Sequence, residues 1–236
     1  MGNSTFAHKG GVHVSAVSRH APTYDHIDPA LVGNARRILV SELSGKSNVL
    51  MKSRALDGNA KATTAVLDLL KKKELEGYHF EGAEASFELL VQRALGKHEP
   101  AFTLDHYRVE VESGDEGEVI TEATVKLQVR GRADHTVGEG DGPVNALDKA
   151  LRKSLEKFYP SLKEMTLTDY KVRVVNASAG TAAKVRVLIE SRDRKDEWTT
   201  MGVSTNLIEA SWLALVDAVE YKLLKDSRKT LPTGPN

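Results

Sequence analysis

The sequence of 236 residues contains no cysteine, which excludes a disulfide framework, a thiolate nucleophile and any cysteine-ligated metal site. It also has no apolar run of the roughly 18–20 residues needed for a membrane-spanning helix, and no signal peptide at its start. Neither charge sign is in excess, because 33 Lys and Arg residues balance 33 Asp and Glu residues. We therefore expect a cytoplasmic protein that has neither nucleic acid nor membrane as a partner.

Motifs that would let this chain run a reaction by itself are missing as well. The sequence shows no paired carboxylates, no Ser/His/Asp arrangement and no dinucleotide-binding fingerprint. The stretch SGKSN suggests a phosphate-binding loop, but that motif needs a glycine five residues before Gly45, where the sequence has Val40. We interpret SGKSN as a structural turn.

The first hundred residues have the pattern of a small helical region. With 40% hydrophobic and 28% charged residues the chain is typical of a globular protein. Apolar residues recur at helical spacing in residues 61–75 and 82–95, which predicts two amphipathic helices. Gly96 and Pro100 then break the pattern, so we place a domain boundary there and treat residues 1–100 as helical linker subdomains.

From residue 101 onward the hydrophobic period changes from 3.6 to 2, which indicates β-strands. The stretch LDHYRVEV is echoed by LTDYKVRV, and EATVKLQVR by AAKVRVLIE, at an offset near 60–64 residues. A helical pattern follows the third strand in both copies. The sequence therefore predicts an α+β fold with a duplicated β-β-β-α unit, in residues 101–160 and 165–225, followed by a flexible tail over residues 226–236.

Four of the eight histidines fall in the first 26 residues: His8, His13, His20 and His26. Their spacings of five, seven and six do not match the i, i+4 pair of a helical zinc site. Three interpretations stay open on the residues alone: a structural role, an acid–base or substrate contact, or metal binding.

Two further segments are candidates for binding a small ligand. The glycine-rich stretch from Gly138 to Pro143 lies between a predicted strand and a predicted helix, whose first N–H groups could hold a carboxylate. The small residues from Asn176 to Val185 either ease a close chain crossing or leave room for a ligand. A tight structural turn is the alternative interpretation for the glycine-rich stretch.

Taken together, several motifs carry a family resemblance. FAHKGGVHVSAV, YDHIDPALVGNARRILVSELSGKSNVL and GDGPVNAL resemble the C-terminal part of the α-isopropylmalate synthase family, and the second repeat is most similar to its citramalate synthase branch. The resemblance implies a homodimeric acyltransferase whose N-terminal (β/α)8 barrel holds a divalent metal and binds acetyl-CoA. We expect that barrel to be missing here, so this chain would bind no cofactor and would be inactive alone.

The resemblance also implies two groups of site residues. His13 and Tyr24 match residues that reach the active site of the neighbouring subunit, while no metal ligand is implied in this chain. The regulatory domain is expected to bind isoleucine as a feedback inhibitor between two subunits. Positions matching the lining of that effector site are Gly142, Pro143, Val144, Leu167, Tyr170, Val174, Thr181, Ala183 and Val185.

Three alternatives accompany this interpretation. The parent enzyme could be a 2-isopropylmalate synthase that senses leucine, because a methyl-sized difference separates the two effectors. The chain could instead be a stand-alone amino-acid-binding or dimerisation module. A histidine-rich metal-binding protein is the third possibility and predicts stoichiometric zinc on the isolated chain.

Overall fold

The computed structural model describes residues 7–8, 37–38, 60–114 and 117–230. It divides into two compact units, residues 1–98 and 99–236. In the first unit the short strands β1 (Ala7–His8) and β2 (Arg37–Ile38) pair in parallel. The positions His13, His20, Tyr24 and His26 lie outside the described residues, as does the side chain of His8.

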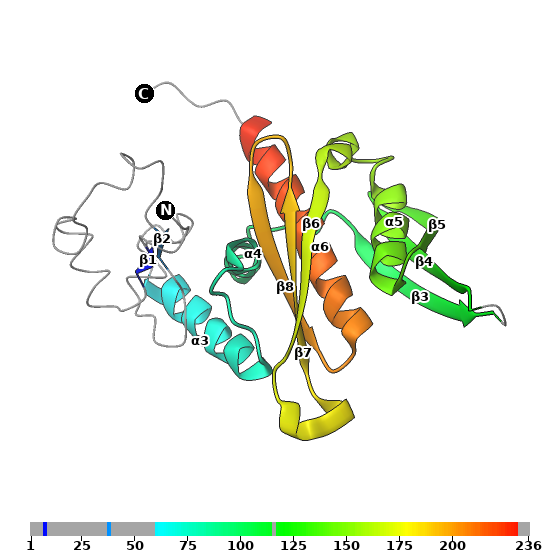
Figure 1. The fold of residues 1–236 in the computed structure, drawn as a ribbon. Coiled ribbons are helices and arrows are strands. Elements are labelled where there is room, and N and C mark those ends of the chain that lie inside the picture. Colours follow the sequence, from blue (N-terminus) through cyan, green and yellow to red (C-terminus); the bar gives the residue numbers. More distant parts are fainter. Residues whose placement is uncertain (1–6, 9–36, 39–59, 115–116, 231–236) are drawn as a thin grey trace. The chain divides into compact units, whose positions relative to one another are not determined.

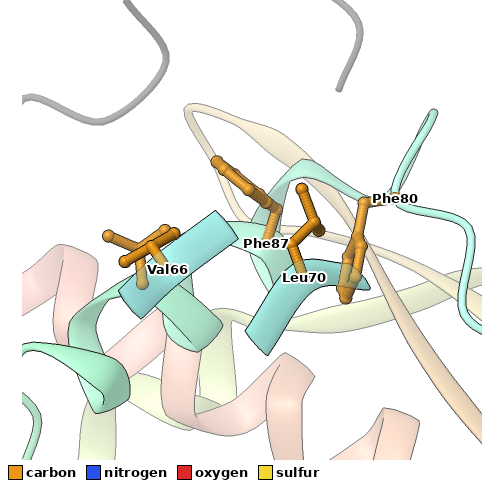
Figure 2. Close-up of a cluster of buried hydrophobic side chains, with 5 residues drawn as sticks. Val66, Leu70, Phe80 and Phe87 are labelled. Atoms are coloured by element: carbon orange, nitrogen blue, oxygen red, sulfur yellow. The ribbon is translucent and has the colours of Figure 1, made fainter. Parts of the chain in front are cut away.

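Among its described residues the first unit also has a helix pair, α3 (Ala60–Glu76) and α4 (Glu84–Ala94), close to the predicted helices. Val66 and Leu70, one turn apart on α3, are buried against Phe80, Phe87 and Val91 (Figure 2). The rings of Phe80 and Phe87 meet edge to face with centroids 6.1 Å apart, a favoured geometry for aromatic pairs. This cluster is the core that holds the two helices together.

The second unit consists of two β-β-β-α repeats (Figure 1). In the first repeat, strands β3 (Thr103–Ser113), β4 (Val119–Val129) and β5 (Arg132–Gly140) form an antiparallel sheet, and helix α5 (Pro143–Leu155) packs on β4 and β5. In the second, β6 (Thr166–Val174), β7 (Val185–Arg192) and β8 (Glu197–Ser204) form the sheet, and α6 (Leu207–Thr230) packs on β7 and β8. The predicted α+β class and duplicated unit are confirmed.

The duplication extends to individual contacts. A bulge interrupts the pairing of β3 between Leu104 and His106, and the same irregularity falls between Leu167 and Asp169 of β6, 63 positions later. In each repeat a threonine of the third strand also donates a hydrogen bond to a helix carbonyl 14 residues on: Thr136 to Ala150 at 2.7 Å and Thr200 to Ala214 at 2.8 Å. Equivalent positions of the strands and helices can therefore be compared residue by residue.

Glycine lets each helix approach its sheet closely. A Cβ atom on Gly138 would lie 2.6 Å from the backbone nitrogen of Ala150, and one on Gly202 would lie 1.9 Å from the carbonyl oxygen of Ala210. Both distances are shorter than any tolerable contact, so only glycine fits while the helix stays in place. The close approach brings the start of each helix beside the end of its third strand.

Two segments differ from the sequence expectation. Residues 138–140 of the glycine-rich stretch continue strand β5, so the turn itself is confined to Asp141 and Gly142. Helix α6 runs on to Thr230, past residue 226, where the tail was expected to begin. An ion pair within the helix supports this extension, because Lys222 Nζ lies 2.9 Å from Asp226 one turn later.

The connections between elements are short. The 3₁₀ helix η3 (Pro160–Glu164) leads from the first repeat to β6, and η4 (Ala177–Ala182) joins β6 to β7 within the small-residue segment. None of the described helices has the length and apolarity to cross a membrane.

Candidate functional site

A cavity of about 580 Å³ lies where helix α5 of the first repeat faces strand β6 of the second. This volume is within the range of small-molecule sites. Because both repeats contribute to its walls, a molecule bound here would touch both. The lining residues are Val144, Asn145, Asp148, Arg152, Lys163, Met165, Thr166, Leu167 and Tyr170.

Helix α5 supplies one wall through residues spaced four apart, Val144, Asp148 and Arg152. The helix begins at Pro143, and its N-cap residue Gly142 makes no side-chain capping bond. The first N–H groups of a helix have no intrahelical partner and carry partial positive charge. The start of α5 beside the cavity is therefore suited to a carboxylate.

Strand β6 supplies the opposite wall with Leu167 and Tyr170, three residues apart. In a regular strand such residues point to opposite faces, but the bulge after Leu167 inserts one residue. Leu167 then pairs with Ser191 and Tyr170 with Ile189, two positions that share one face of β7. The bulge therefore directs both side chains toward the cavity.

Arg152 fixes the segment between the two walls. Its guanidinium group donates hydrogen bonds to the carbonyl oxygens of Met165 at 2.7 Å and Leu162 at 3.0 Å, and it lies 3.2 Å from the carboxylate of Glu156. The planar guanidinium carries several donors in a rigid arrangement, which suits two carbonyl groups at once. Arg152 thus holds the end of η3 and the start of β6 against α5.

Asp148 is a half-buried ionisable group in the cavity wall. Burial raises the pKa of its carboxyl group, an effect that the nearby Arg152 partly offsets. Among the residues that the structure describes, Asp148 has no hydrogen-bond or ion-pair partner. A partly buried carboxylate that accepts no hydrogen bond is costly, and a cationic group of a ligand would relieve that cost.

The cavity contains some of the positions expected from the sequence. Val144, Leu167 and Tyr170 line it, and Gly142 and Pro143 form the start of α5 next to it. The remaining expected positions lie at the other end of the second sheet and are not among the lining residues: Val174 at the end of β6, its cross-strand partner Val185, and Thr181 and Ala183 in and after η4.

Sequence reasoning missed six lining residues. Asp148 and Arg152 carried a detectable signal, because they follow Val144 at helical spacing on α5. Asn145 sits beside Val144 and accepts a hydrogen bond from the backbone N–H of Asp141. The other three follow no periodic pattern and come from the connection into β6: Lys163, Met165 and Thr166.

No cluster of three or more potential metal ligands occurs in the described parts of the chain. The N-terminal histidine cluster falls outside those parts.

The fold and the cavity define a duplicated α+β domain with room for a small molecule between its repeats. A family model described as the LeuA allosteric (dimerisation) domain matches residues 81–223. A second, described as homocitrate synthase post-HMGL domain-like, matches residues 1–74. The first match covers more than half of the chain, so the chain belongs to the family of the LeuA allosteric (dimerisation) domain.

Individual relatives agree with this assignment. An (R)-citramalate synthase of Geobacter sulfurreducens is 55% identical over 230 residues, which cover 95% of this chain and 44% of that protein. An (R)-citramalate synthase of Aquifex aeolicus is 53% identical over 234 residues, which cover 97% of this chain and 44% of that protein. A 2-isopropylmalate synthase of the same organism is 32% identical over 231 residues, which cover 95% of this chain and 42% of that protein. The chain thus spans less than half the length of these curated relatives.

Proposed function

We propose that the chain is the regulatory part of a citramalate synthase-like acyltransferase, which condenses pyruvate with acetyl-CoA to give citramalate and CoA. Support comes from the relatives named (R)-citramalate synthase and from the match to an allosteric domain. The divalent metal and acetyl-CoA would be bound by a barrel domain beyond this sequence. No catalytic step is assigned to the described residues.

The ligand proposed for the α5–β6 cavity is isoleucine, acting as a feedback inhibitor. The observation that carries this proposal is the Asp148 carboxylate, which faces the cavity without a partner among the described residues. It would bind the ammonium group, while the N–H groups at the start of α5 would bind the carboxylate. Leu167, Met165 and the ring of Tyr170 would surround the branched side chain.

A homodimer is proposed for the same domain. Helices α5 and α6 pack mainly on the second and third strands of their sheets, and the first strands β3 and β6 keep some apolar side chains uncovered. Val111 on β3 is 55% exposed and Val174 on β6 is 57% exposed. A second copy of the chain would bury these valines, in line with the dimerisation in the family description. In that dimer the partner would supply to the effector site the four expected positions that lie away from the cavity: Val174, Thr181, Ala183 and Val185.

His13 and Tyr24 are proposed to act at the barrel of the neighbouring subunit. A histidine near its ordinary pKa can assist in deprotonating the acetyl methyl group or in positioning a water molecule. Tyr24 would hydrogen-bond to the same centre. Effector binding would act on these residues by favouring one of two conformations of the intervening linker.

Isothermal titration of this chain with isoleucine, leucine, valine and threonine tests the proposed ligand. We expect binding of isoleucine in preference to leucine, with a difference of about 1–3 kcal/mol because one methyl group changes position. The 2-keto acid with an oxo group in place of the amino group of isoleucine should bind far more weakly, since it offers no cation to Asp148. Binding of the keto acid as tightly as isoleucine, or no binding of any amino acid, would contradict the proposal.

A 2-isopropylmalate synthase that senses leucine is the second candidate, supported by the relative of that name in Aquifex aeolicus. The chain is 53% identical to the (R)-citramalate synthase of that organism and 32% identical to its 2-isopropylmalate synthase, which favours the first candidate. Preferential binding of leucine in the same titration would reverse this order.

A further inference from the structure

The duplicated unit contains two crossings between a helix of one repeat and the first strand of the other. Helix α5 faces β6 at the cavity, and Tyr170 of β6 is one of its walls. At the other crossing α6 meets β3, where Tyr107 is the position equivalent to Tyr170, 63 residues earlier. The two crossings can be compared because the pairing of the first strand repeats at an offset of 63 residues and the threonine–helix contacts repeat at 64.

The second crossing is filled by a side chain of the protein itself. The rings of Tyr107 and Trp212 have centroids 5.1 Å apart, and Trp212 is only 5% exposed. Helices α5 and α6 start at Pro143 and Leu207, so Trp212 occupies the position on α6 that Asp148 occupies on α5. An indole therefore stands where the cavity has a carboxylate and open space.

The start of the second helix is satisfied internally as well. Asn206, the counterpart of Gly142, accepts hydrogen bonds through its side-chain oxygen from the backbone N–H groups of Ile208 at 2.8 Å and Glu209 at 3.2 Å. Gly142 has no side chain and provides no such cap for α5. The N–H groups that remain available at the cavity are thus already used at the second crossing.

We propose that the β3–α6 crossing is a second copy of the ligand site, closed by Trp212 in the cavity position and by Asn206 over the helix start. Each chain then keeps one open site, at α5–β6. The class of molecule that both crossings accommodate, a zwitterion with an apolar side chain, rests on the proposed function. The structural equivalence of the crossings does not.

Copying the closed crossing onto the open one tests this equivalence without any ligand. The variant Asp148→Trp should fold, because the indole has the cavity to occupy and Tyr170 to pack against. We expect a melting temperature several degrees above that of the unaltered chain, since a buried carboxylate is replaced by an apolar ring. The control Lys149→Trp places the same ring at the adjacent exposed position and should not raise the melting temperature. A lower melting temperature for Asp148→Trp than for this control would overturn the equivalence.

The reverse change opens the closed crossing. In the Asp148→Trp background, Trp212→Gly should lower the melting temperature, and added indole should restore much of the loss in a concentration-dependent way. Trp212→Leu in the same background leaves a smaller space, so added indole should raise the melting temperature of this variant less. Equal indole shifts in Asp148→Trp with and without Trp212→Gly would contradict a site at this crossing. These readouts use no amino acid, so they stand or fall separately from the isoleucine titration.

Discussion

The hydroxyl group of Tyr170 lies 2.9 Å from the side-chain oxygen of Ser211. Ser211 itself donates to the carbonyl oxygen of Leu207 at 2.8 Å, so Tyr170 is the donor of the bond between the two side chains. Strand β6 at the cavity wall is thereby linked to the first turns of α6. Any ligand that moves the ring of Tyr170 would act on the position of that helix.

Replacing Tyr170 by phenylalanine should lower the free energy of unfolding by about 1 kcal/mol, because one intramolecular hydrogen bond is lost and the ring is kept. Chemical denaturation measures this change. Tyr107→Phe is a matched control, since no hydrogen bond to the Tyr107 hydroxyl occurs within the described residues. The control should be close to neutral, and an equal loss in both variants would argue against a specific role for the Tyr170–Ser211 bond.

Gly202→Ala should destabilise the second repeat by about 3 kcal/mol, because the new Cβ atom would lie 1.9 Å from the carbonyl oxygen of Ala210. Helix α6 would have to move away from β8 to accept it. Thermal unfolding of this variant is best compared with that of Gly142→Ala, where the added atom meets nothing within 4 Å and the backbone is extended. A cost for Gly202→Ala below that of the control would show that the helix–strand contact is looser than described.

Asp148→Asn should make the ligand-free protein more stable at neutral pH. Burial raises the pKa of Asp148 in the folded state, so folding favours its protonated form. The stability that this group contributes is complete below its unfolded pKa of about 3.9 and is lost as pH rises through the higher folded pKa. The advantage of the variant should therefore be absent near pH 3 and present at pH 7.

Denaturation at both pH values measures this difference. Isoleucine titration of the same variant separates stability from function, because the variant is expected to fold better and bind worse. An unchanged affinity would remove Asp148 from the proposed ligand site.

Asp193→Asn should cost about 3–5 kcal/mol at pH 7, since it removes one member of a buried ion-pair cluster. Only 4% of the Asp193 side chain and 3% of the Lys222 side chain are exposed, and their charged atoms are 3.1 Å apart. Burial alone would raise the pKa of Asp193, but its polar contacts, led by the ion pair with Lys225, outweigh burial and hold the pKa well below its usual range.

The effect should depend on pH in a defined direction. A carboxyl group with a lowered folded pKa stabilises the protein above its unfolded pKa of about 3.9, and this contribution is lost as pH falls further. The gap between Asp193→Asn and the unaltered chain should shrink below about pH 4. Asp196→Asn, at a side chain that is half exposed, serves as the control and should cost less than about 1 kcal/mol.

Much of the fold could be predicted from the sequence, because the patterns of its strands and helices are visible in short stretches. The period-two strands and the repeat of LDHYRVEV as LTDYKVRV predicted the duplicated unit without any long-range information. The cavity was only partly accessible to the same reasoning. Leu167 and Tyr170 share a face only because of the bulge between them, and no single-sequence pattern marks that bulge.

Asp148 shows a second limit of sequence reasoning. Its position on the face of Val144 follows from helical spacing, but its place in a cavity wall depends on β6, which begins 18 residues after it. A charged residue on an amphipathic helix is usually solvated, so the pattern alone indicates an ordinary surface aspartate. The effect of a distant strand on its environment becomes visible only in the folded chain.

The peptide link between the two repeats has a consequence for symmetry. Two identical β-β-β-α units that met as separate molecules would have to carry the same residue at both crossings, so both would be open or both closed. Joined through η3 in one polypeptide, the units can differ, with Asp148 in one and Trp212 in the other. Covalent fusion thus allows one half to specialise in recognition while the other provides a rigid scaffold.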